Sequence, residues 1–178
     1  MLRLAHIMER ICTYAARVAG LLLFALTAVI LYEIIGRQFY NTNSVALGEL
    51  QWHLHGVIAL LGFGYAYTRD AHVRIDLVSQ NFSQPFRMKL EILGIILFLT
   101  PFMILIIQHG SDFAYRSYIR SEGSNGGLGL DHRFIIKSII PISAILALMG
   151  AYSVVLRMIV VLRGNLKDPY ESKELWKS

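Results

Sequence analysis

The chain has 178 residues, of which 55% are hydrophobic and only 16% are charged. Average soluble domains carry about 25% charged residues, and disorder needs low hydrophobicity, so the composition excludes both a compact soluble fold and a disordered chain. The net charge is +5, but the basic residues border apolar runs, as membrane topology requires, and form no nucleic-acid motif. We therefore predict an all-α integral membrane protein that binds no nucleic acid.

The first apolar run, residues 18–37, predicts a membrane span. A stretch of 18 residues covers about 27 Å as a helix, close to the hydrocarbon thickness of a bilayer and too long for the apolar region of a signal peptide. We expect this span to stay uncleaved.

The segment before this run predicts an N-terminal amphipathic helical extension at the cytoplasmic surface. Arg3, Arg10 and Arg17 recur every seven residues on one face. Apolar residues recur at intervals of three and four on another face, and they are Leu4, Ile7, Met8, Ile11, Tyr14, Ala15 and Val18. We expect this helix to continue into the first span as one long tilted rod.

Three further apolar runs predict spans at about 50–67, 90–110 and 135–162. The run 50–67 is the least hydrophobic, and Pro101 within the third run predicts a kink. None of the runs alternates with a period of two, and an open sheet cannot satisfy its backbone in lipid, so all four spans are expected to be helices.

The distribution of basic residues predicts the orientation of the chain. Twelve of the 17 lysines and arginines lie in residues 1–17, 69–89 and 157–178. The positive-inside rule then places both termini and the middle loop in the cytoplasm, which agrees with an even number of spans. The sequence therefore predicts one four-helix membrane domain over residues 1–163, followed by a polar cytoplasmic tail over residues 164–178.

Three charged residues near the outer ends of the first two spans form a candidate helix brace. Glu33 and Arg37 are one helical turn apart, and a short loop allows Glu49 to approach Arg37. The favoured interpretation is a structural brace that fixes how the two helices cross. A direct role in ion or substrate passage and ordinary interfacial snorkelling remain as alternatives.

The second span carries candidate residues for packing against a partner. Gly56, Gly62 and Gly64 permit the close approach of another helix, and Trp52 suits the membrane interface at the start of the span.

The segment after the second span offers candidate contacts with the cytoplasmic loop or with lipid. Arg69, His72 and Arg74 are able to bind lipid phosphates, and Asp76 is able to pair with them. The alternative interpretation is a solvated turn.

His53 and His109 raise the alternative of a b-type cytochrome anchor. In the predicted topology both lie near the outer surface, where two histidines on facing helices are able to ligate a haem iron. The favoured interpretation is that of ordinary interfacial histidines. A third reading, a free-standing channel or sensor, lacks pore-lining polar residues.

Other catalytic and cofactor signatures are missing from the sequence. There is no nucleophile elbow, P-loop or zinc-binding histidine pair, and the single cysteine, Cys12, allows no disulfide within the chain. We expect no enzyme activity, metal or cofactor.

The order of several motifs resembles the small membrane subunit (DctQ-like) of tripartite ATP-independent periplasmic (TRAP) transporters. Arg37 follows the first span in Gly-Arg-Gln-Phe-Tyr-Asn, Glu49 and Trp52 open the second, and Thr-Arg-Asp-Ala-His-Val-Arg-Ile-Asp-Leu ends at Leu77. The likeness covers about residues 10–163. The sequence Trp-His-Leu-His ending at His55 departs from the commoner pattern and is similar to the branch associated with mannitol-type or aromatic carboxylate systems.

The resemblance implies a multi-pass protein of the bacterial inner membrane with two protein partners. One is a large membrane subunit that carries the substrate and sodium sites, and the other is a soluble periplasmic protein that captures an organic acid and docks on the pair. The resemblance further implies transport driven by a sodium gradient, with the small subunit as part of the fixed scaffold.

Overall fold

The computed structural model describes residues 1–40, 44–69, 71, 83–124 and 128–164, and in these ranges every regular element is helical. The elements, in chain order, are α1 (Leu2–Tyr40), α2 (Val45–Thr68), α4 (Gln84–Gly94), a π-helical turn η1 (Ile95–Leu99), α5 (Thr100–Ile119) and α6 (Phe134–Leu162). The prediction of an all-α chain is confirmed.

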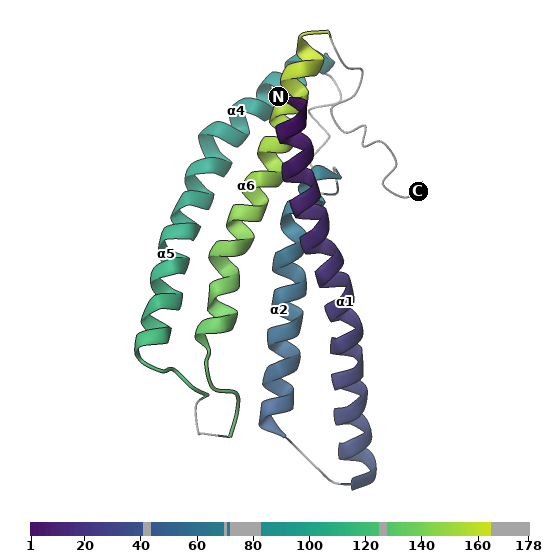
Figure 1. Cartoon of the computed structure of the whole chain (residues 1–178), viewed down its shortest axis with the longest axis vertical. Helices are drawn as coiled ribbons and strands as arrows, with labels where there is room; N and C mark the ends of the chain where they lie inside the picture. The colour runs from purple at the N-terminus through teal and green to yellow at the C-terminus, as the bar shows by residue number, and fades with distance from the viewer. Residues whose placement is uncertain (41–43, 70, 72–82, 125–127, 165–178) are drawn as a thin grey trace.

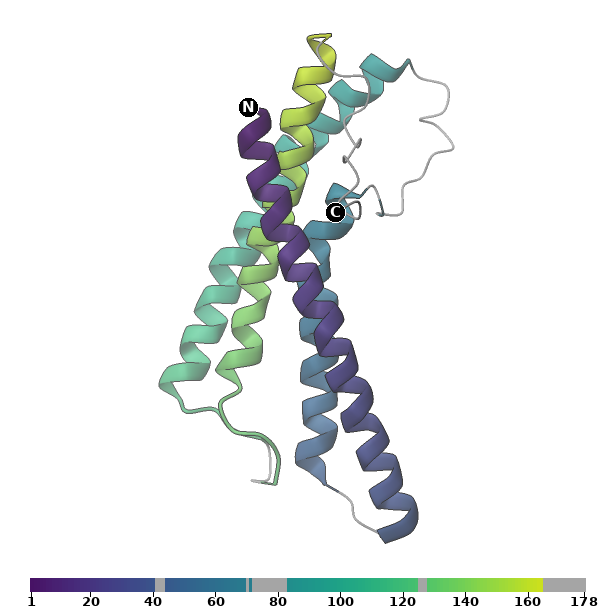
Figure 2. The ribbon, with the colours of Figure 1, turned by 45° about the vertical axis from the view of Figure 1, so that its right-hand side comes forward.

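The helices form an up-and-down arrangement around α6 (Figure 1). Helices α2 and α5 pack on either side of α6, while α1 packs along α2 and crosses α6 near its own N-terminus. The start of α1 and the end of α6 lie at one end of the molecule, and the end of α5 and the start of α6 lie at the other. Figure 2 shows that the α1–α2 pair spreads away from the α5–α6 pair toward this second end.

Among the described residues, three helical stretches are long and apolar enough to cross a membrane, namely Leu2–Tyr40, Gln84–Ile119 and Phe134–Leu162. The predicted span 50–67 lies on α2, which has 24 residues but is less apolar, because it contains His53 and His55. The chain is thus a multi-pass membrane protein by the length and composition of its helices.

Helix α6 is the only one of these three stretches that is largely enclosed by the rest of the chain. In the apolar segment of 18 residues within α6, 56% of the residues are buried. The corresponding segments of Leu2–Tyr40 and Gln84–Ile119 have 11% and 6% of their residues buried. Its buried residues pack against the α4–η1 segment, where Met88 contacts Val154 and Met158, and Ile95 contacts Ala151 and Val155. Most of the apolar surface of the outer helices therefore faces away from the chain.

The predicted distortion at Pro101 takes the form of a π-helical turn rather than a break. Helices α4 and α5 join through η1 into one continuous but bent helix (Figure 1). Pro101 has no N–H to donate, and in the turn before it the Thr100 N–H bonds to the carbonyl oxygen of Ile95. The Thr100 hydroxyl also donates to this oxygen over 2.8 Å and lies 3.0 Å from the Tyr152 hydroxyl of α6.

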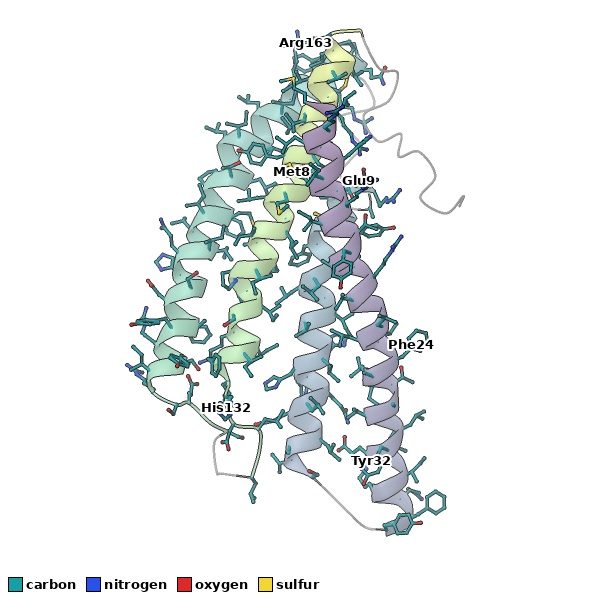
Figure 3. All side chains as sticks on the ribbon, in the orientation of Figure 1. Met8, Glu9, Phe24, Tyr32, His132 and Arg163 are labelled. Atoms are coloured by element: carbon teal, nitrogen blue, oxygen red, sulfur yellow. The ribbon has the colours of Figure 1, made fainter. Side chains whose placement is uncertain are left out.

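The N-terminal extension is helical, and it packs on the rest of the chain through small and polar residues. It is one continuous helix of 39 residues with the first span. The predicted apolar face is exposed, as at Leu4 (53%), Ile7 (56%) and Tyr14 (71%), whereas Ala5, Glu9, Cys12, Thr13 and Ala19 are buried. Such packing is typical of helices in a membrane, because apolar side chains gain nothing from leaving lipid and small and polar residues make the contacts between helices. Phe24, farther along α1, likewise points away from the other helices (Figure 3).

Candidate functional site

Glu49, in the second turn of α2, binds the connection between α5 and α6. Its carboxylate accepts hydrogen bonds from the Ser124 hydroxyl (2.6 Å), the Leu130 N–H (2.8 Å) and the Arg133 guanidinium (2.9 Å). We call these four residues the loop cluster. The cluster lies at the end where the two helix pairs spread apart, so it ties α2 to the start of α6 across the opening.

The local backbone of the connection is shaped to reach Glu49. Ser121 (φ 46°) and His132 (φ 65°) adopt the left-handed conformation that reverses the chain after α5 and before α6. A Cβ atom at Gly129 would overlap the Ser124 hydroxyl and the Glu49 carboxylate. Glycine is therefore the residue that lets this backbone approach the carboxylate so closely.

A second ion pair fastens the same end of the α5–α6 pair. Lys137 of α6 donates to the Glu122 carboxylate, and its Nζ atom lies 3.9 Å from the centre of the Phe113 ring on α5. The Arg133 N–H donates to the Glu122 carbonyl oxygen over 3.1 Å. Together with the loop cluster, this pair fastens the described parts of the connection, 120–124 and 128–133, to α2, α5 and α6.

These contacts lower the pKa values of both carboxyl groups. The pKa of Glu49 lies below its usual value because Ser124, the Leu130 N–H and Arg133 all favour the ionised form, the Ser124 bond most strongly. The hydrogen bond from Lys137 is the main cause of the lowered pKa of Glu122. Both groups are therefore ionised at neutral pH.

Acidification is expected to release the connection from α2. Because the pKa of Glu49 is lower in the fold than in the unfolded chain, its contribution to stability is complete above the usual pKa of 4.5 and is lost as the pH falls through the lowered value. Hydrogen-exchange protection of the Leu130 N–H should accordingly drop in acid. Glu49→Gln is the control, since a neutral amide removes this pH dependence; protection that stays constant in the parent chain would contradict the assignment.

The predicted brace is rearranged in the structure. Glu49 pairs with Arg133 and not with Arg37, which is exposed and has no ion pair among the residues that the structure describes. Glu33 contacts α2 in another way, by accepting a hydrogen bond from Gln51. The carboxylate Glu49 does join helices, but its partner lies 84 positions away in the chain.

A buried ion pair that the sequence analysis missed lies at the opposite end of the molecule. Glu9 of α1 and Arg157 of α6 are 6% and 3% exposed, and the Arg157 guanidinium donates to the Glu9 carboxylate. His6 stands beside the pair, with its Nδ1 atom 3.4 Å from the Arg157 guanidinium. Figure 3 shows Glu9 near the N-terminus, toward the end that carries Arg163 and away from His132.

Two sequence signals point to this pair. Glu9 is the only acidic residue before Glu33, and Arg157 is the first charged residue after an uncharged stretch of α6 over 138–156. A single acidic residue among arginines and a single arginine that ends an uncharged stretch are candidates for a pair, because a charge that is buried without a partner is costly.

The predicted packing glycines have different environments. A Cβ at Gly64 would overlap the backbone of Leu146 and lie 2.9 Å from the Cys12 sulfur, so Gly64 packs inside the chain, where α1, α2 and α6 cross, and is not available to a partner. Gly56 makes an ordinary contact with Ile136 of α6 (3.9 Å), whereas nothing lies within 4 Å of a Cβ at Gly62. Trp52 is 78% exposed.

The predicted cytoplasmic contacts are only partly described. The Arg69 guanidinium lies over the Tyr65 ring, 5.2 Å from its centre, at the end of α2. His72, Arg74 and Asp76 lie outside the described residues, as does the predicted tail apart from Gly164.

The haem alternative finds no support in the arrangement of the helices. His53 is on α2 and His109 is on α5, and these helices pack on opposite sides of α6 (Figure 1). His109 is also exposed. The two imidazoles therefore do not face each other as axial ligands must.

Comparison with known proteins identifies a family. The family model for the DctQ component of tripartite ATP-independent periplasmic transporters matches residues 26–161, which is most of the chain. No curated protein matches the sequence.

Proposed function

Since the chain belongs to the DctQ family, whose members are components of TRAP transporters, we propose that it is the small scaffold subunit of an importer. This importer is coupled to sodium, depends on a binding protein, and carries an organic acid or a related small solute. In this role it packs on the large transport subunit, which holds the substrate and sodium sites, and helps to dock the periplasmic binding protein. It has no turnover of its own. The two histidines in the sequence Trp-His-Leu-His ending at His55 favour the mannitol-type or aromatic carboxylate branch.

The spacing of charges along the helices supports four membrane spans, including α2. Glu49 and Arg69 are 20 positions apart with no charge between them, and so are Lys137 and Arg157 of α6. Twenty helical residues cover about 30 Å, the thickness of the hydrocarbon core. Helix α2 is thus long enough to span the bilayer beside α6.

The positions of the basic residues support an orientation with both termini in the cytoplasm of a bacterium, across the inner membrane. Arg3 and Arg10 on α1 and Arg163 after α6 lie at the same end of the molecule. The loop cluster lies at the other end, which then faces the periplasm. The positive-inside rule favours this orientation over the reverse.

The observation that carries the scaffold role is that the bundle is fastened at both ends. The loop cluster joins α2 to the start of α6, and the Glu9–Arg157 pair joins α1 to the last turns of α6. A transport domain must move relative to something stationary, and a bundle whose helices are tied at two levels resists sliding. Its outer helices, in contrast, leave much apolar surface for a partner and lipid.

Deleting this chain is expected to abolish sodium-dependent uptake by the complete transporter. The measurement is uptake into proteoliposomes that contain the large subunit and the binding protein, with and without this chain. Liposomes with this chain alone should show no flux. Uptake that survives the deletion, or failure of the two membrane proteins to purify together, would refute the proposal.

A further inference from the structure

Three buried polar atoms beside the Glu9–Arg157 pair have no hydrogen-bond partner in the described part of the chain. They are the carboxylate oxygen Oε1 of Glu9, the Nε–H group of Arg157 and the hydroxyl group of Thr13. The three residues are 6%, 3% and 9% exposed, respectively, so solvent around the protein does not reach these atoms freely. Buried polar groups almost always have a partner, because a group without one loses its hydration and gains nothing in return.

The three atoms belong to one region between α1 and the rest of the chain. The Arg157 guanidinium donates to the Oε2 atom of Glu9, so the unpaired Nε–H and the unpaired Oε1 lie on two groups that are already bonded to each other. Thr13 follows Glu9 by four residues, which places it on the same side of α1, one turn farther along. That side of α1 faces protein, since Ala5 is buried on it as well.

The Thr13 hydroxyl differs from other hydroxyl groups in these helices. Serine and threonine side chains inside a helix commonly bond to a carbonyl oxygen of the preceding turn. The hydroxyl groups of Thr27, Thr68 and Ser153 do so. The Thr13 hydroxyl makes no such bond within the described residues, so it is available to a group outside its own helix.

The three atoms define the chemistry of the ligand that fits beside them. Oε1 of Glu9 accepts a hydrogen bond, Nε–H of Arg157 donates one, and the Thr13 hydroxyl is able to do either. The guanidinium repels a cation, the carboxylate repels an anion, and an apolar group satisfies none of the three atoms. Water is neutral, both donates and accepts, and makes about three hydrogen bonds when it is buried.

We propose that an ordered water molecule is bound beside the Glu9–Arg157 pair. It donates to Oε1 of Glu9, accepts from Nε–H of Arg157 and forms its third hydrogen bond with the Thr13 hydroxyl. The contact between α1 and α6 then consists of the ion pair together with this water, and Thr13 contributes to the contact through the water. This water site does not depend on the proposed transport role.

The first test removes the hydroxyl group and keeps the shape of the side chain. Thr13→Val is expected to lower the melting temperature of the purified chain by about 2–4 °C, because the water loses one of its partners. Thr27→Val is the matched control on the same helix, since the exposed Thr27 hydroxyl bonds to the Leu23 carbonyl oxygen of its own helix; it should have little effect. A melting temperature that stays constant or rises in Thr13→Val would overturn the proposal.

The second test asks whether Thr13 acts through the ion pair. In the double variant Glu9→Met with Arg157→Met the water has lost its charged partners, so Thr13→Val should no longer lower the melting temperature in this background. An equal drop in both backgrounds would assign the effect to the packing of Thr13 and would also overturn the bound water.

A direct test needs no variant. In a density map of the purified protein in lipid, at a resolution that shows ordered solvent, we expect a water peak within hydrogen-bond distance of Oε1 of Glu9 and Nε of Arg157. A map that shows other ordered waters but has no peak at this position would refute the site.

Discussion

Replacing Arg157 with Leu is expected to lower the free energy of unfolding by roughly 3–5 kcal/mol, the cost of leaving one member of a buried ion pair without its partner. The substitution strands the Glu9 carboxylate, which is 6% exposed, between α1 and α6. His6 is the neighbouring polar group, but its Nδ1 atom lies 4.0 Å from the Glu9 carboxylate, which is beyond hydrogen-bond distance. Unfolding of the purified chain by denaturant in mixed micelles measures the change.

Two comparisons isolate the pair. Arg10→Leu removes a charge from an exposed position one residue away from Glu9 and should have little effect. The double variant Glu9→Met with Arg157→Met should recover most of the lost stability, since apolar side chains of similar size often replace buried ion pairs without loss. If the double variant is as unstable as Arg157→Leu, the pair is not the source of the effect.

Gly150→Ala is expected to separate α2 from α6 and to destabilise the chain by about 1–3 kcal/mol or more, as overpacking of a tight contact does. The new methyl group would overlap the carbonyl oxygen of Gly64, and a backbone atom cannot move aside as the tip of a side chain can. Gly64→Ala should act similarly, because its Cβ would overlap the carbonyl of Leu146. The melting temperature in detergent reports the loss.

The matched control for this contact is Gly62→Ala, because Gly62 lies on α2 two residues before Gly64. Nothing lies within 4 Å of a Cβ at Gly62, so the substitution should be neutral or slightly stabilising, since alanine favours the helix over glycine. Equal melting temperatures for Gly62→Ala and Gly150→Ala would contradict the close crossing of α2 and α6 at Gly64 and Gly150.

Both predictions concern contacts that keep α1, α2 and α6 in one arrangement. The Glu9–Arg157 pair joins α1 to α6 through charge, and the Gly64–Gly150 crossing joins α2 to α6 through shape. The proposed role as a stationary support depends on such contacts, because in the described part of the chain only 11% and 6% of the apolar segments of α1 and the α4–α5 helix are buried.

Local patterns in the sequence were sufficient to predict where the helices lie along the chain. Runs of apolar residues and the charges that border them located all four long helices, and Pro101 marked the π-helical turn before it. The positions of helices depend on residues a few positions apart in the chain. The reason is that the hydrogen bonds of a helix, and its transfer into lipid, involve only the residues of that one segment.

The sequence alone therefore determined that the chain is helical, apolar enough for a membrane, and similar in motif order to the DctQ family. Only the tertiary structure decided that Glu49 meets Arg133 and not Arg37, that Glu9 meets Arg157, that Gly64 packs inside while Gly62 stays free, and that α1 packs through its small residues. The two ion pairs join residues 84 and 148 positions apart, so they depend on how whole helices cross. In lipid the hydrophobic pattern does not specify that crossing, since every apolar face is equally well solvated, and close backbone contact and charge pairing decide it instead.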